Sequence, residues 1–180
     1  SRPDFMVRER GLTAAQRGTA LHLAMQYLPL DGDHSPEMIR EELSRLTEAG
    51  FLTSQQGAAV SPEIPAAFFA SELGRKLLAS QEVHREFKFS ILTPAADYGP
   101  GLEGEQVLLQ GVVDCWFTGP EGITILDFKS DRICSGGEAA RGEEYRPQLE
   151  AYSRALERIT GQRVAHRVLW FFATGTSLEL

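Results

Sequence analysis

The stretch "ITILDFKSDRI" (Ile123–Ile133) joins an apolar strand to three charged side chains. Its first four residues are two isoleucines, a threonine and a leucine, a composition typical of a strand buried on both faces. Successive residues of a strand point to opposite faces, so Asp127, Lys129 and Asp131 share one face if the strand persists. Charges gathered at the end of a buried strand form either a solvated edge or a functional site.

The residues around this strand predict an α/β fold. Apolar periodicity predicts helices over 12–28, 35–50, 61–80 and 145–160, and strands over 83–92, 106–117, 122–129, 165–174 and 177–180. The Pro/Gly-rich segment 93–105 reads as a loop, and 135–144 as a flexible connection. We expect one domain, with a mainly helical portion over 1–80 and a β-meander, a crossover helix and final strands over 81–180. This order predicts a mixed sheet flanked by helices.

Composition limits the possible functions. The chain has 180 residues, 42% hydrophobic and 24% charged, which is typical of a globular protein, and no apolar run approaches the ~20 residues of a membrane helix. A net charge of −7 argues against a stand-alone nucleic-acid binder. There is no Walker-type loop, hence no expected ATP site. Two cysteines, Cys115 and Cys134, predict a reduced, cytoplasmic setting. The first ten residues lack a signal peptide and an initiator Met, so we expect a piece of a larger chain.

Two aspartates are predicted to face each other across a hairpin. If Thr118 pairs with Ile123 across the loop "GPEG", then Asp114 lies opposite Asp127, with Cβ atoms roughly 5 Å apart. Two carboxylates at that distance repel, and a divalent cation such as Mg²⁺ or Mn²⁺ removes the repulsion. Lys129, one strand period further, is then placed to orient a water or to stabilise charge on a phosphate.

Each of these residues also has an ordinary interpretation. An Asp–Lys pair at a solvated hairpin end is common, but Asp114 interrupts the apolar run "GVVDCWF" and Asp127 follows "ITIL". Buried acidic residues seldom lack a partner, which favours the metal site. His22, one turn after Gly18 and off the apolar stripe of its helix, is a candidate third ligand, although most helical histidines are not ligands. Glu86 is a weaker candidate.

A glutamine and a tyrosine on the last predicted helix share one face. Gln148 and Tyr152 are spaced i, i+4, so they either contact substrate or, in the case of Tyr152, pack against the neighbouring apolar residues. Several basic side chains are candidates for phosphate contacts, although most basic surface residues only solubilise: Arg75, Lys76, Arg85, Lys88, Arg132, Arg141 and Arg146.

Four short motifs in order resemble the RecB-type branch of the PD-(D/E)XK nuclease superfamily. They are "RGTALH", "GVVD", "ILDFKS" and "QLEAY", which span Gly18 to Tyr152. Within this branch, "YRPQLEAYSRAL" and "RVLWFFATG" most resemble the nuclease domain of AddA-type helicase–nuclease subunits. The motifs depart from the family pattern in two places, since Val113 replaces the proline and "DFKS" replaces Asp-Tyr-Lys-Thr. Neither change removes a predicted ligand.

The resemblance implies a restriction-endonuclease-like core and a role for each motif residue. His22, Asp114, Asp127 and the backbone carbonyl of Phe128 would bind Mg²⁺, with Mn²⁺ as a substitute. Lys129 would be the catalytic lysine, with Asp114 and Asp127 also required for catalysis. The substrate side would be formed by Gln148 and Tyr152.

The resemblance also implies a setting for the reaction. The domain would hydrolyse single-stranded DNA ends delivered by the helicase portion of the same parent chain, with an AddB-type partner subunit, during recombinational break repair. An AddB-type assignment is disfavoured, because that subunit carries further cysteines for an iron–sulfur cluster, which we do not expect here. Two alternatives remain open: an inactive DNA-binding or subunit-docking module with the nuclease fold, and a stand-alone RecB-like exonuclease.

Overall fold

The computed structural model describes residues 12–101, 103–131 and 136–180. The chain divides into two compact units, Ser1–Ala67 and Phe68–Leu180, and each is described by itself. Among the residues that the structure describes, no helix has both the length and the apolar character needed to cross a membrane.

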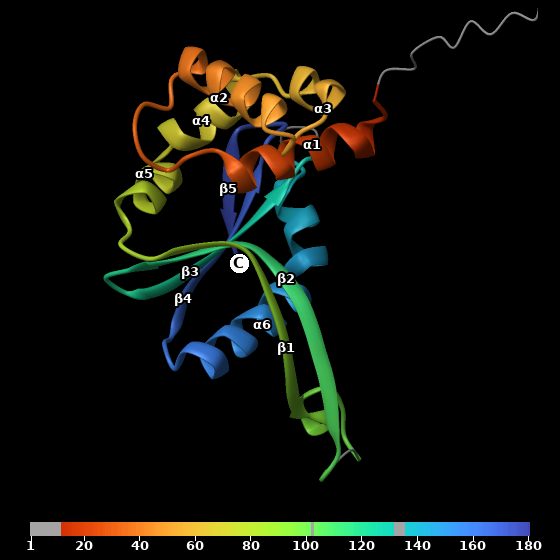
Figure 1. Cartoon of the computed structure of the whole chain (residues 1–180). Coiled ribbons are helices and arrows are strands. Elements are labelled where there is room, and N and C mark those ends of the chain that lie inside the picture. Colours follow the sequence, from red (N-terminus) through yellow and green to blue (C-terminus); the bar gives the residue numbers. More distant parts are fainter. Residues whose placement is uncertain (1–11, 102, 132–135) are drawn as a thin grey trace, which may run out of the picture. The chain divides into compact units, whose positions relative to one another are not determined.

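The first unit is helical. It contains α1 (Ala14–Tyr27), α2 (Pro36–Glu48), α3 (Ser54–Ala59) and the start of α4 (Glu63–Ala70) (Figure 1). Thr13 and Ser35 cap α1 and α2 as predicted, each accepting a hydrogen bond from a backbone N–H of the first turn. The sequence pattern missed α3, whose six residues include none that is buried. A helix without a buried stripe leaves no apolar period to detect.

The second unit is built on one five-stranded sheet. Its elements are α5 (Glu72–Ala79), β1 (Val83–Pro94), the 3₁₀ turn η1 (Ala95–Asp97), β2 (Gln106–Gly119), β3 (Gly122–Lys129), α6 (Glu138–Thr160), β4 (Val164–Phe171) and β5 (Thr176–Glu179). The strand order is β1-β2-β3-β4-β5. All neighbours are antiparallel except β3 and β4, which are parallel and joined through α6. The predicted mixed α/β sheet with a crossover helix is confirmed.

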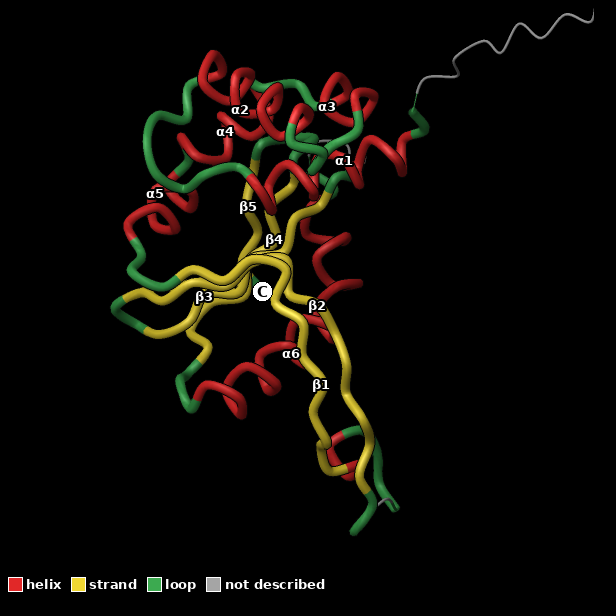
Figure 2. The backbone as a smooth tube through the Cα atoms, in the orientation of Figure 1, coloured by secondary structure: helices red, strands yellow, loops and turns green. Residues whose placement is uncertain are grey.

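The β1–β2 hairpin extends beyond the other strands. Residues 106–117 of β2 pair with β1, whereas β3 pairs with only the last five residues of β2, 115–119. Figures 1 and 2 show the two strands projecting as a long arm away from the rest of the sheet.

Two predicted elements were wrong in extent. The helix predicted over 61–80 is broken at Ser71, whose side chain caps α5 by accepting a hydrogen bond from the Gly74 N–H at 3.0 Å. The flexible connection predicted over 135–144 is helical from Glu138 onward, because α6 starts seven residues before Tyr145. Pro147 therefore lies inside the helix, where it removes one backbone donor.

Both faces of β3 are covered, so the strand is buried along nearly its whole length. On one face, Ile123 and Ile125 pack with Leu149 and Leu156 of α6. On the other, Phe128 meets Phe68, in the last part of α4, with ring centroids 5.2 Å apart. The charged end of β3 thus emerges from a two-sided core, which gives it a fixed position.

The hairpin between β2 and β3 has the predicted register. Thr118 pairs with Ile123, and the ladder continues one pair beyond, to Gly119 and Gly122. The loop is therefore two residues rather than four, and Gly122 has φ +132°, a conformation open to glycine. The shorter loop keeps the same pairing sum, so Asp114 and Asp127 remain at the same level of the two strands.

Candidate active site

Asp127 is a buried carboxylate at the end of β3. It is 6% exposed and lies on the same face as Ile123 and Ile125, toward α6. The pKa of Asp127 is raised to about 6, first by burial and then by the neighbouring charge of Asp114, with the Lys129 ammonium opposing both. The repulsion predicted between the two aspartates is therefore present.

Asp114 is tied to the adjacent strand by its side chain. Its Oδ2 accepts a hydrogen bond from the Phe128 backbone N–H at 2.8 Å, one level beyond the last ladder pair, Cys115 with Leu126. A hydrogen bond from a backbone N–H to a charged carboxylate is strong, and this one fixes the Asp114 carboxylate beside the end of β3.

The β1–β2 ladder is irregular at the same level. It runs from Arg85–Cys115 to Phe87–Val113, and Glu86 between them has φ +50°. A positive φ is unusual for glutamate, and such strained conformations gather at functional sites. The weak sequence candidate Glu86 thus lies next to Asp114 in the sheet, while its predicted role stays a prediction.

Lys129 closes the charged end of β3. Its ammonium forms an ion pair with Asp127 Oδ2, and its side chain is 13% exposed. The same nitrogen lies 3.5 Å from the ring centroid of Tyr145 on α6. Lys129 is therefore held between a carboxylate and an aromatic face, with its remaining donors available to a third group.

The donor set of these strands fits a hard divalent cation. Asp127 Oδ2 is in contact with the Lys129 ammonium, but within the described residues no donor reaches this buried oxygen with hydrogen-bond geometry. Two carboxylates that repel each other, one with an oxygen short of hydrogen bonds, are suited to Mg²⁺ or Mn²⁺. The carboxylates of Asp114 and Asp127 would hold the ion.

The third predicted ligand lies in the other unit. His22 is a half-buried residue of α1 in the first unit, whereas both aspartates belong to the second. Across residues 12–101, 103–131 and 136–180, no group of three or more His, Cys, Asp or Glu side chains is assembled. The roles of His22 and of the Phe128 carbonyl therefore stay predictions.

Gln148 and Tyr152 are brought together as their spacing predicts. Gln148 Nε2 donates to Tyr152 Oη at 2.7 Å. Tyr152 is 8% exposed and packs edge-to-face on Phe89 at 5.4 Å. Tyr152 therefore packs in the core. A substrate contact by Gln148 and Tyr152 remains a prediction.

Gly111 links the second family motif to the fourth. A Cβ at Gly111 would lie 2.7 Å from Tyr152 Cε1 and 2.8 Å from Phe89 Cζ. Real Cβ atoms essentially never approach so closely, so the glycine of "GVVD" is required by the tyrosine of "QLEAY". The two motifs are thus one packing unit that seats α6 on the sheet.

Tyr145 is the neighbour that the sequence reasoning missed. It precedes Gln148 by three residues and Tyr152 by seven, which is the spacing of one helix face, and this signal was available. Its hydroxyl donates to Asp131 Oδ2 at 3.0 Å. β3 ends at Lys129, so Asp131 joins the site through Tyr145 and not through the strand face predicted for it.

The basic residues predicted for phosphate contacts are mostly engaged with neighbours. Lys76 pairs with Glu72, Arg146 with Glu143, and Arg141 with both Asp131 and Glu144. Arg132 and Cys134 lie outside the described residues.

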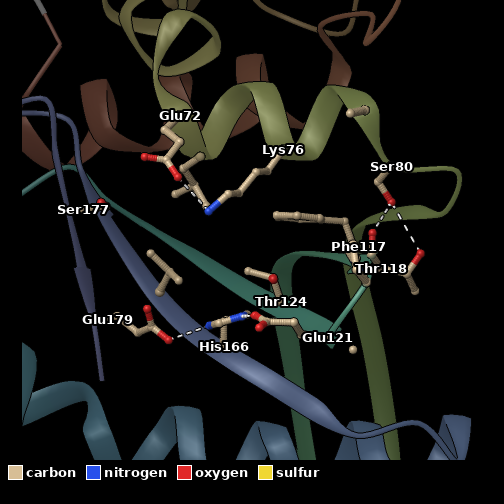
Figure 3. Close-up of a pocket in the computed structure, with 16 residues that line it drawn as sticks. Glu72, Lys76, Ser80, Phe117, Thr118, Glu121, Thr124, His166, Ser177 and Glu179 are labelled. Carbon is tan, nitrogen blue, oxygen red and sulfur yellow. Dashed lines mark hydrogen bonds and ion pairs between the residues drawn. The ribbon is translucent and has the colours of Figure 1, made fainter.

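A pocket of about 640 Å³ lies elsewhere in the second unit. Figure 3 shows α5, the β2–β3 turn, β4 and β5 around it, with His166 between Glu121 and Glu179. Thr124 lines it, and alternation along β3 places Thr124 on the face opposite Asp127. The pocket is therefore separate from the charged end of β3, and its lining includes none of Asp114, Asp127 and Lys129.

Comparison with known proteins identifies the family of the chain. A family model described as the PD-(D/E)XK nuclease superfamily matches residues 3–178. Three similar proteins, each named as an ATP-dependent helicase/nuclease subunit, come from Desulforudis audaxviator (41% identity over 180 residues), Geobacillus kaustophilus (42% over 185) and Pelotomaculum thermopropionicum (41% over 181). The alignments cover 97–99% of this chain but only 14–15% of those proteins. The match over nearly the whole chain shows that this chain belongs to the PD-(D/E)XK nuclease superfamily.

Proposed function

We propose that the chain is a metal-dependent DNA nuclease domain that hydrolyses phosphodiester bonds. The observation that carries the proposal is the buried carboxylate of Asp127 at the end of β3, with Asp114 on the neighbouring strand and Lys129 beside it. Burial and the like charge of Asp114 give the Asp127 carboxylate a high electrostatic cost, and an apolar residue at that position would fill the end of β3 at lower cost.

Each residue has a defined part in this chemistry. A divalent cation bound here supplies a Lewis acid for the scissile phosphate and for water. Asp114 and Asp127 hold the ion, and the Phe128 N–H keeps the Asp114 carboxylate oriented. Lys129 directs an N–H at the attacking water or at the charge that develops on the phosphate. The family motifs would make His22 a third ligand and would place Gln148 and Tyr152 on the substrate side.

The wider setting is proposed from the relatives. They are called helicase/nuclease subunits, and the chain corresponds to about one seventh of their length. We infer that a helicase portion of a longer parent delivers single-stranded ends to this domain, alongside an AddB-type subunit, in the cytoplasm and during recombinational break repair. An exonucleolytic mode follows from delivery of ends.

Cleavage by point variants tests the proposal. Asp127→Ala and Lys129→Ala should abolish cleavage of single-stranded DNA in Mg²⁺ or Mn²⁺, while circular dichroism shows the same secondary structure. Removal of the cation with a chelator should have the same effect on the unmodified chain. Wild-type cleavage rates in Asp127→Ala would refute the site.

Two other functions give different results. An inactive docking module would bind no Mn²⁺, so calorimetric titration would give no stoichiometric, chelator-reversible heat. A stand-alone exonuclease would cut as fast without the parent chain as within it. The retained Asp114, Asp127 and Lys129 argue against the docking module, which has no need of them, and the net charge of −7 argues against independent DNA binding.

A further inference from the structure

The ammonium of Lys129 needs more than one contact to stay in place. A lysine side chain has four rotatable bonds, and fixing it costs conformational entropy. The ion pair with Asp127 supplies one anchor. In the proposed reaction Asp127 also holds a cation, so it cannot serve Lys129 alone. A second anchor that does not compete for carboxylate oxygens is therefore required.

The ring of Tyr145 has the geometry of that second anchor. Lys129 Nζ lies 3.5 Å from its centroid, well within the ~6 Å of a cation–π contact. Such a contact attracts the ammonium without removing its N–H donors from water or phosphate. Because the lysine side chain is only 13% exposed, the attraction is weakly screened by solvent.

Tyr145 is itself held from two directions. Its hydroxyl donates to Asp131 Oδ2 at 3.0 Å, and Arg141 binds the same oxygen through Nη2 at 2.8 Å and Nε at 3.2 Å. The ring also packs against the core between α6 and the sheet. Tyr145 shares its helix face with Gln148, so the position of the ring is set by the seating of α6.

We propose that Tyr145 is a positioning residue, whose ring fixes the Lys129 ammonium for the reaction. The inference rests on the proposed function, since it assigns Lys129 a task in cleavage. It predicts that the aromatic face matters more than the hydroxyl, which acts only through Asp131.

Proton NMR tests the contact without any need for activity. The chain has three lysines, Lys76, Lys88 and Lys129, so the Lys129 signals can be assigned from their loss in Lys129→Ala. The ring current of Tyr145 should shift the Lys129 ε-protons upfield in the wild type and in Tyr145→Phe. In Tyr145→Leu the signals should move to the position of an ordinary lysine. Unshifted Lys129 protons in the wild type would overturn the inference.

Kinetics test the consequence for cleavage. Tyr145→Leu should lower kcat about tenfold with KM within about twofold, since the anchor acts on the ammonium and not on substrate affinity. Tyr145→Phe, which keeps the ring, should restore kcat to within about threefold of the wild type. Tyr98→Leu is the matched control, because Tyr98 also lies near a cation, Arg154 at 5.8 Å, but on the β1–β2 arm, and its kcat should be unchanged.

The outcomes separate this inference from the proposed function. If Lys129→Ala cuts like the wild type, the proposed function fails and the positioning role fails with it. If Lys129→Ala is inactive but Tyr145→Leu keeps full kcat, or Tyr145→Phe is as slow as Tyr145→Leu, only the positioning role is refuted. A loss of folding in Tyr145→Leu would appear in its NMR spectrum. The Lys129 ε-proton shift and the kcat of Tyr145→Phe, each compared with the wild type, would then decide.

Discussion

Asp114 shows how one residue can serve folding and chemistry with different atoms. Its Oδ2 accepts the Phe128 N–H, a task that an amide oxygen can also perform. Its charge raises the pKa of Asp127, a cost that the Lys129 ammonium opposes and that a divalent cation between the two carboxylates would relieve further. Fold and function can therefore be separated at this position by a change that removes the charge and keeps the acceptor.

Asp114→Asn should leave stability nearly unchanged and weaken metal binding. The free energy of unfolding should stay within about 1 kcal/mol of the wild type, because the acceptor is kept and a like-charge repulsion is lost. Mn²⁺ affinity, measured by calorimetry, should fall at least about tenfold with the loss of a charged ligand. Asp97→Asn, which removes the same charge from the η1 turn, is the control and should keep Mn²⁺ affinity. Equal Mn²⁺ affinity in both variants would contradict the ligand assignment.

The sequence was informative about residues whose chemistry is unusual for their surroundings. Asp114 and Asp127 were found because each interrupts an apolar run, and their pairing followed from the hairpin register. Tyr145 was missed because an aromatic residue on a helix is usually core, and its contact with Lys129 depends on how α6 crosses the sheet. Neither hydrophobic periodicity nor spacing along one chain segment contains that crossing geometry.

At the level of elements, the packing of α6 on the β1–β2 arm depends on Gly111, a position without a side chain. Gly111→Ala places a Cβ within 2.8 Å of the Phe89 and Tyr152 rings, so those rings or the helix must shift. The free energy of unfolding should fall by roughly 1–3 kcal/mol, measured by urea denaturation. Gly119→Ala lies in the same strand with its Cβ 3.8 Å from the nearest atom, Gly122 O, and should cost little. Equal stability of the two variants would contradict the close packing.

The β2–β3 turn, β4 and β5 are joined by one histidine. His166 contacts Glu179 through Nδ1 at 2.6 Å and Glu121 through Nε2 at 2.7 Å. The hydrogen bond with Glu179, and then that with Glu121, raises the pKa of His166 above its ordinary 6.5. Glu72 and Lys76, which also line this pocket, pair with each other.

Because the pKa of His166 is raised in the folded state, the stabilisation by its contacts with Glu121 and Glu179 depends on pH in a defined direction. Its contribution to stability is complete below pH 6.5 and is lost as the pH rises through the folded-state pKa. The stability difference between the wild type and His166→Gln should therefore shrink from pH 5.5 to 8.5, measured by urea unfolding. Glu121→Gln with Glu179→Gln should bring the NMR-monitored pKa of His166 back toward 6.5. A stability difference that is constant across this pH range would refute a stabilising role for the contacts of His166 with Glu121 and Glu179.

Element boundaries were predictable where capping and burial agree. The two helices that Thr13 and Ser35 cap and the strand 122–129 were placed correctly, because each of these elements has both a local signal and a buried face. The start of α6 was predicted too late, at Tyr145, whereas the helix begins at Glu138 and its upstream turns pack against β5. A Cβ at Gly142 would lie 2.3 Å from Leu178 Cδ2 and 3.0 Å from Leu180 Cδ2, so a larger side chain there would have to displace these leucine side chains. Such tertiary contacts override the local preference.

For the whole molecule, the negative net charge limits how tightly the chain can bind DNA. Affinity for the phosphate backbone depends on Lys and Arg, and this chain carries a net charge of −7. The isolated chain should bind single-stranded DNA with a Kd no tighter than about 10⁻⁶ M at physiological salt. Fluorescence anisotropy in Ca²⁺, chosen to limit cleavage, measures this value. A nanomolar Kd would contradict the proposal that a longer parent supplies the grip on DNA.

The proposed mechanism depends on a divalent cation bound between strands β2 and β3. The most direct measurement is the anomalous difference map from crystals soaked in Mn²⁺. We predict a peak about 2–2.3 Å from carboxylate oxygens of both Asp114 and Asp127. Crystals of Asp127→Ala treated in the same way should lack this peak. A map with no Mn²⁺ peak at this pair, or with peaks only at unrelated surface carboxylates, would contradict the central claim.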